Sequence, residues 1–218
     1  MPNPKTTLQA SELEDLFCLS ARVFADYRSP PLGPFALAYI MSETSDNEES
    51  GFLRAVELAR TGAMLAIGIC DGDTTHGYDG FDHSVDRLKV YGLSNSFPIE
   101  KIVTDRVNTR TEADSLIPCM MGRKGDLAII APPFHIVRAF VTMVTVVRQL
   151  DVPLRVYAVP GVPLQWTAKV RHSQGDLVST RAGLLTDELT RLEKYQAVDG
   201  GSMLPADEVL KYLDWRDE

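Results

Sequence analysis

The chain has 218 residues and a formal net charge of −8, with 44% hydrophobic and 24% charged residues. These values are typical of a globular protein with one sizeable domain. They argue against a nucleic-acid-binding protein, which needs a basic surface, and against a membrane protein, because no apolar run approaches the roughly 20 residues of a span. The first residues contain no apolar segment of signal-peptide type, so we expect a cytoplasmic protein.

The predicted elements begin with an amphipathic helix over 11–27, in which Leu13, Phe17, Leu19 and Val23 are expected to cover one face. Prolines and a glycine then interrupt the pattern. Downstream, short apolar runs alternate with segments of helical periodicity. The predicted strands are 35–41, 63–70, 101–106, 126–132 and 154–160. The predicted helices are 52–62, 83–92, 109–125, 134–150, 184–197 and 205–214.

This alternation predicts an α/β fold: a doubly wound, mostly parallel sheet of about five strands, Rossmann-like, with a helical C-terminal extension. The polar segment 161–182 is expected to be irregular. We accordingly divide the chain into an N-terminal helix and linker (1–33), a Rossmann-like core (34–182) and a helical C-terminal extension (183–218).

His135 and Arg138 lie just beyond the fourth predicted strand, in IIAPPFHIVRAF. In open α/β sheets, ligands bind beyond the carboxyl ends of the strands, and a spacing of three residues places both side chains on one helix face. His135 is therefore a candidate for acid/base catalysis, and Arg138 for binding a carboxylate or phosphate. Equally open is a structural interpretation, in which His135 caps the helix and Arg138 pairs with a neighbouring acid.

The segment VNTRTEA marks a helix start after the third predicted strand. Asn108 suits the N-cap position, and the carboxylate of Glu112 is favourable near the first turn. Capping accounts for Asn108 but not for Arg110. We therefore include Asn108, Thr109 and Arg110 among the candidate ligand-binding residues, and Thr109 would orient the ligand. These residues are expected beside His135 if the third and fourth strands are neighbours.

Two motifs in this order resemble the YdcF/SanA/ElyC-like family. That family carries S-x-N-T-x-E-N-A and, one strand later, a segment with H-m-x-R-A; the corresponding segments here are RVNTRTEA and APPFHIVRA. Asn108, Thr109, His135 and Arg138 match the family pattern. The resemblance implies a Rossmann-like fold and a small anionic or nucleotide-type ligand, with S-adenosylmethionine as a candidate.

The chain departs from this family after its first two predicted strands. The family has glycine-rich turns there, whereas this chain has SETSDNEES and GICDGD. Glycines allow a close backbone approach to a ligand; acidic residues instead suit a metal ion, an amine or a ribose hydroxyl. Ser42 and Glu43 are candidate lining residues of the site. Asp71 stands where a Rossmann fold binds a ribose, although a tight Asp-Gly turn is the favoured interpretation.

Other candidates have weaker support. The loop 71–83 contains His76, His83 and several aspartates, but the spacing matches no known metal site, so we favour a solvated loop and assign no metal. His172 is a candidate lid residue in the irregular segment, and Trp166 is either a stacking face for a ring or a packed residue. The three cysteines lack the number and spacing of a disulfide framework or a zinc site.

Two hypotheses for the function follow. The first is a small-molecule-binding, Rossmann-like protein of this family, with catalysis left open, in which Arg138 holds an anionic group and His135 acts either as a hydrogen-bond donor or as the acid/base. The second is a non-catalytic interaction protein, in which the acidic substitutions in the first two loops mark a decayed site.

Overall fold

The computed structural model describes residues 10–26, 33–74, 77–172, 177–196 and 202–218. Its centre is a five-stranded sheet in the order β3-β2-β1-β4-β5, in which all neighbouring strands are parallel. The strands are β1 (Leu37–Ile40), β2 (Ile67–Asp71), β3 (Ile99–Val103), β4 (Leu127–Ala131) and β5 (Val156–Pro160). This sheet confirms the predicted α/β fold.

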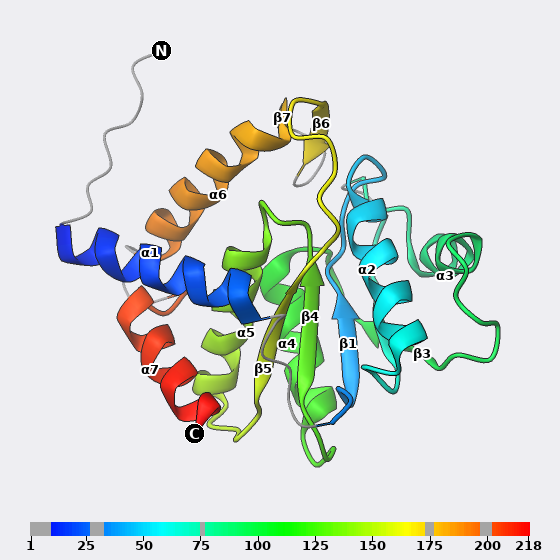
Figure 1. Cartoon of the computed structure of the whole chain (residues 1–218), viewed down its shortest axis with the longest axis horizontal. Coiled ribbons are helices and arrows are strands. Elements are labelled where there is room, and N and C mark those ends of the chain that lie inside the picture. Colours follow the sequence, from blue (N-terminus) through cyan, green and yellow to red (C-terminus); the bar gives the residue numbers. More distant parts are fainter. Residues whose placement is uncertain (1–9, 27–32, 75–76, 173–176, 197–201) are drawn as a thin grey trace.

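Helices cover both faces of the sheet (Figure 1). The helices are α1 (Ala10–Ala25), α2 (Glu48–Thr61), α3 (Phe81–Val90), α4 (Thr109–Met120), α5 (Ile136–Gln149), α6 (Arg181–Gln196) and α7 (Ala206–Asp217). On one face, α2 and α3 bury Phe52 and Leu88 against the strands. On the other, α1, α4, α5 and α7 pack around Phe140 and Tyr212. No helix in the described part of the chain has the length and apolarity needed to cross a membrane.

The central strand β1 and its neighbour β4 are buried along their whole length. A parallel strand with helices on both faces needs a continuous apolar run, which LAYI and LAIIA provide. After β1 the chain moves outward to β2 and β3, and it returns to the centre at β4. The strand order therefore reverses between β1 and β4, which is where open α/β sheets bind their ligands.

A two-stranded hairpin occupies part of the segment that was predicted to be irregular. Its strands, β6 (Lys169–His172) and β7 (Leu177–Thr180), are antiparallel, and they lie beyond the carboxyl ends of β1 and β4 (Figure 1). Each strand has only four residues, many of them polar, so its periodicity is too weak to detect in the sequence. In β6, only Val170 and His172 are buried.

The buried face of α1 differs from the predicted one. Leu19 and Val23 are fully buried, as expected, but Leu13 and Phe17 are 39% and 68% exposed. The buried stripe instead runs from Leu16 to Leu19 and Val23, because these positions face α7 and β5. Consequently α1 and α7 belong to the same hydrophobic cluster as the sheet.

Element boundaries also shift relative to the sequence prediction. β3 begins at Ile99 rather than at residue 101, and α4 ends at Met120, with Pro118 in its last turn. α5 begins at Ile136, so His135 occupies the N-cap position rather than the first turn. The side chain of His135 makes no capping hydrogen bond, which leaves the imidazole available for contacts elsewhere.

Candidate functional site

A cavity of about 490 Å³ opens at the point where the strand order reverses. Its walls come from the loop after β1, the start of α4, the start of α5, the hairpin and α6. The volume lies in the range of small-molecule sites. The predicted site residues in its lining are Ser42, Glu43, Asn108, Thr109, Arg110, His135 and Arg138.

Asp71 is the predicted site residue that does not line this cavity. Its carboxylate Oδ2 lies 3.3 Å from Lys101 Nζ on the neighbouring strand β3. Nearby, Asp73 Oδ1 accepts a 3.3 Å hydrogen bond from the Val107 backbone N–H. The DGD segment thus connects two strand-end loops, as a structural turn would.

One cluster with potential metal ligands joins the start of α2, the loop before α3 and the first turn of α3. His83 Nε2 lies 3.0 Å from Glu48 Oε2 and 3.7 Å from Asp79 Oδ2. Arg87 already pairs with Glu48 at 3.2 Å, so the cluster carries its own counter-charge. His76 lies outside the described residues, and Trp166 is 38% exposed and away from the cavity.

Helix capping positions the α4 residues of the site. Asn108 is extended, and its side-chain oxygen accepts hydrogen bonds from the backbone N–H groups of Arg110 and Thr111, both at 3.0 Å. This arrangement confirms the predicted N-cap. Thr109 is then the first residue of α4, at the positive end of the helix dipole.

Thr109 meets His135 although β3 and β4 are not neighbours in the sheet. The two residues meet, as expected, but the expected reason is wrong, because the strands that precede them are not adjacent. α4 is the connection that crosses from the edge strand β3 back to the central strand β4, and it packs beside α5. The start of α4 therefore reaches the carboxyl end of β4.

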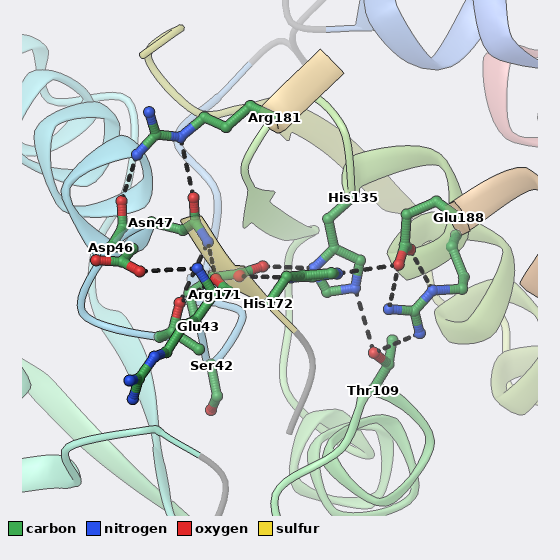
Figure 2. Close-up of polar contacts among 12 residues, drawn as sticks. Ser42, Glu43, Asp46, Asn47, Thr109, His135, Arg171, His172, Arg181 and Glu188 are labelled. Carbon is green, nitrogen blue, oxygen red and sulfur yellow. Dashed lines mark hydrogen bonds and ion pairs between the residues drawn. The ribbon is translucent and has the colours of Figure 1, made fainter. Parts of the chain in front are cut away.

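A chain of polar contacts runs through the cavity wall (Figure 2). Glu43 Oε1 lies 2.6 Å from His135 Nδ1. The other ring nitrogen, His135 Nε2, lies 3.2 Å from Thr109 Oγ1. Thr109 Oγ1 in turn accepts a 2.8 Å hydrogen bond from Arg138 Nη1. Glu43, His135, Thr109 and Arg138 are all more than nine-tenths buried.

Burial and neighbouring charges separate the protonation states of Glu43 and His135. Burial alone would raise the pKa of Glu43, but His135 and His172 more than offset it and hold that pKa at about 2. Burial, together with the positive charge of Arg138, lowers the pKa of His135 below its ordinary value. At neutral pH the pair is therefore a carboxylate and a neutral imidazole, the form in which histidine acts as a base.

Glu188 on α6 connects this helix to α5 and to β6 of the hairpin. Its carboxylate pairs with Arg138 through Nε and Nη2 and lies 3.0 Å from His172 Nε2 and 3.2 Å from Arg191 Nη1. Burial opposes the charge of His172, but Glu188 and Glu43 raise its pKa to about 9. The structural interpretation, in which Arg138 pairs with a neighbouring acid, therefore describes its contact with Glu188 but not its contact with Thr109.

Sequence reasoning did not identify Glu188 as a site residue. A signal for it was nevertheless present in the sequence. Glu188 lies four residues from both Leu184 and Leu192, so it shares their helix face, and both leucines are buried. An acid on the apolar face of a helix requires a positive partner, but periodicity does not reveal which one.

Glu112 is a second buried acid in the cavity wall, and its chemistry differs from that of Glu43. Glu112 Oε2 accepts hydrogen bonds from Tyr39 OH at 2.8 Å and from the Ser42 backbone N–H at 3.0 Å. No described cation pairs with it. Burial, with a contribution from the negative charge of Glu43, raises the pKa of Glu112 to about 7.

The rim of the cavity is positively charged, although the chain as a whole is acidic. Arg110 Nε lies 3.0 Å from Asp114 on its own helix. Glu43 and Glu188 are matched in charge by Arg138 and His172, and Arg191 also lies beside Glu188, so the excess of positive charge in the lining comes from Lys194. Lys194 is exposed and has no ion-pair partner among the described residues. The arrangement favours an anion at the rim.

The comparisons with known proteins identify no family for this chain. A scan against protein-family models found no match, and a search of curated proteins found none either. The fold therefore defines the class, a Rossmann-like α/β protein with a polar cavity at the reversal of strand order.

Proposed function

We propose that this protein is a small-molecule enzyme that binds an anionic, nucleotide-type ligand in the cavity and uses His135 as its general base. The observation that carries the proposal is the Glu43–His135–Thr109 chain, which is held in one protonation pattern and faces a cavity with a cationic rim. A carboxylate that orients a neutral imidazole toward a cavity hydroxyl is the arrangement used in general-base catalysis.

Membership of the YdcF/SanA/ElyC-like family is part of the proposal. Asn108, Thr109, His135 and Arg138, the four residues that match the family motifs, all line one cavity. This convergence supports the resemblance, because a chance match of two short motifs would not require their residues to meet. The family's suggested ligand, S-adenosylmethionine, has a net positive charge, because its sulfonium and ammonium groups outnumber its one carboxylate, and the positive rim disfavours this charge. We therefore propose a ligand with a phosphate or carboxylate.

The alternative, an interaction protein without catalysis, is favoured by one feature of α1. Leu13, Phe17 and Phe24 share one helix face and are 39%, 68% and 42% exposed. An apolar stripe of this kind is a candidate contact for another protein. The two functions predict different results for ligand binding at the cavity.

Ligand binding is tested by titrating the purified protein with AMP, adenosine and S-adenosylmethionine in a calorimeter. We expect AMP to bind more tightly than the two ligands without a phosphate. Lys194→Met should weaken AMP about tenfold, because one charge-assisted hydrogen bond is lost, and should leave adenosine unchanged. Lys169→Met is the matched control, since Lys169 is also an exposed lysine but lies outside the cavity.

Equal affinities for AMP and adenosine would contradict the anionic-ligand assignment. Absence of binding by all three ligands would favour the interaction protein.

A further inference from the structure

The hydrogen-bond directions around Thr109 follow from the donors and acceptors present. A guanidinium can only donate, so Thr109 Oγ1 uses one lone pair to accept from Arg138 Nη1. Glu43 is a carboxylate and only accepts, so His135 carries its proton on Nδ1. His135 Nε2 is then left with a lone pair, and the Thr109 hydroxyl donates to it. The chain of donation runs from Arg138 to Thr109 to His135 to Glu43.

We propose that Thr109 is a catalytic nucleophile that accepts an acyl group from an anionic ester or acyl phosphate. The order hydroxyl, imidazole, carboxylate is that of a nucleophile activated by a base, with the base oriented by a third group. Arg138 and the start of α4 both place positive charge beside Thr109 Oγ1, which stabilises negative charge as it develops on that oxygen. This inference deepens the proposed function and rests on it.

The donors near Thr109 favour an acyl group over a phosphoryl group. A transferring phosphoryl group needs donors or metal ions for three equatorial oxygens, whereas a carbonyl develops charge on one oxygen. Two N–H groups at the start of α4, those of Arg110 and Thr111, are already bonded to Asn108. Arg138 is already engaged by Glu188. Because these donors are already engaged, few are left for three equatorial oxygens, and a single oxyanion makes the smaller demand.

The proposed reaction has two steps, with water as the second reactant. Thr109 Oγ1 forms a bond to the carbonyl carbon, while its proton passes to His135 Nε2. The bond from that carbon to the leaving oxygen then breaks, and the leaving group departs with the electron pair and takes the proton from His135. Water next attacks the carbonyl carbon of the acyl-threonine and gives one proton to His135. The bond from that carbon to Thr109 Oγ1 then breaks, Oγ1 takes this proton back from His135, and the carboxylic acid product leaves and releases its remaining proton to solvent.

The test uses the full chain and an anionic activated ester, the mono-p-nitrophenyl ester of terephthalic acid, whose carboxylate cannot reach its own ester group. We expect a burst of p-nitrophenolate and, by peptide mass spectrometry, one 4-carboxybenzoyl group on Thr109. Thr109→Val should abolish both signals, and Thr109→Ser should retain them, because serine restores the hydroxyl. A purely structural role for the hydroxyl would not produce acylation at this residue.

Thr145→Val is the matched control for the structural cost of the change. Thr145 is also a buried threonine, its hydroxyl bonds to the Val141 carbonyl and to the Leu204 backbone N–H, and it lies outside the cavity lining. This variant should be acylated on Thr109 like the parent protein. The burst rate of the parent should rise with pH through a value below 6.5, because only neutral His135 accepts the proton and its pKa is lowered.

The outcomes separate this inference from the proposed function. Carboxybenzoyl groups found on lysines alone, or on Thr109 in the absence of a burst, would overturn the nucleophile even where AMP binds normally. Acylation of Thr109 in a protein that binds AMP and adenosine equally well would support the nucleophile and overturn the anionic ligand class.

Discussion

At the scale of single residues, the cavity holds two buried glutamates whose pKa values are shifted in opposite directions from the ordinary value. Glu43 has histidine partners and a pKa of about 2, whereas Glu112 accepts only from Tyr39 and the Ser42 N–H and has a pKa of about 7. Neutral donors stabilise a carboxylate less than charged ones do, so burial dominates at Glu112. Near neutral pH, Glu112 therefore exists partly as the acid.

Glu112→Gln should make the protein more stable than the parent at pH 8. The folded-state pKa of Glu112 lies above the ordinary value, so the parent loses stability as pH rises from 4.5 to 7, by about 3 kcal/mol at most. A glutamine carbonyl can accept both hydrogen bonds, since both reach the same oxygen, Oε2. Urea unfolding at pH 5 and pH 8 measures the difference. The same pH dependence in both proteins would contradict the assignment.

At the scale of elements, the hairpin and α6 close the cavity from the side opposite the sheet. The Arg171 carbonyl accepts from Thr44 Oγ1 at 2.8 Å and from Asn47 Nδ2 at 2.9 Å, and Arg181 Nε donates to Asn47 Oδ1 at 3.0 Å (Figure 2). These contacts attach the hairpin to the loop after β1. On the other side, Glu188 attaches α6 to α5 and β6 through ion pairs.

Glu188→Gln should loosen the hairpin and leave the sheet intact. The change removes the negative charge that Arg138 and His172 share, and breaking a buried ion pair costs about 3–5 kcal/mol. Hydrogen exchange should therefore accelerate in β6 and β7 but not in β1 and β4. Asp187→Asn, the same charge change on the adjacent residue, is the control. Uniform acceleration across the sheet would show that Glu188 supports the whole fold instead.

At the scale of the whole molecule, the two ends of the described chain join over the edge strand β5. Asp26, just after α1, accepts from Arg216 Nη1 on α7 at 2.6 Å, and its Oδ2 also accepts from the Ala158 N–H at 2.8 Å. Arg216 Nη1 donates to the Val156 carbonyl at 2.9 Å. Both charged side chains are more than nine-tenths buried. This ion pair thus joins the end of α1 to α7, which is far away in the sequence, and both side chains also bind the backbone of β5.

Arg216→Ala should lower the free energy of unfolding by about 3–5 kcal/mol, because it leaves the buried charge of Asp26 without its partner. Arg22→Ala is the control, since Arg22 pairs with Asp214 and Asp217 at the surface and should contribute about 1 kcal/mol or less. Thermal unfolding measures both variants. A single transition that shifts as a unit is expected. A separate early transition of α1 and α7 would contradict this shared stability.

Much of the fold could be predicted from local sequence patterns. Each of the five sheet strands was predicted within a few residues, because LAYI and LAIIA are apolar runs bounded by polar loops. The hairpin was not predicted, because short polar strands have no such pattern. The buried face of α1 was mispredicted, because several apolar residues on one helix allow more than one stripe, and only the neighbouring elements select among them.

The sequence by itself determined the alternation of strands and helices, the cap at Asn108 and the position of His135 and Arg138 beyond a strand, since these depend on residues close together in the chain. Only the tertiary structure decided which charges meet. Glu43, Thr109, His135 and Glu188 come from four separate segments, and the crossing of α4 and the placement of α6 bring them together. Contacts and burial set their protonation states, and neither is encoded in local spacing.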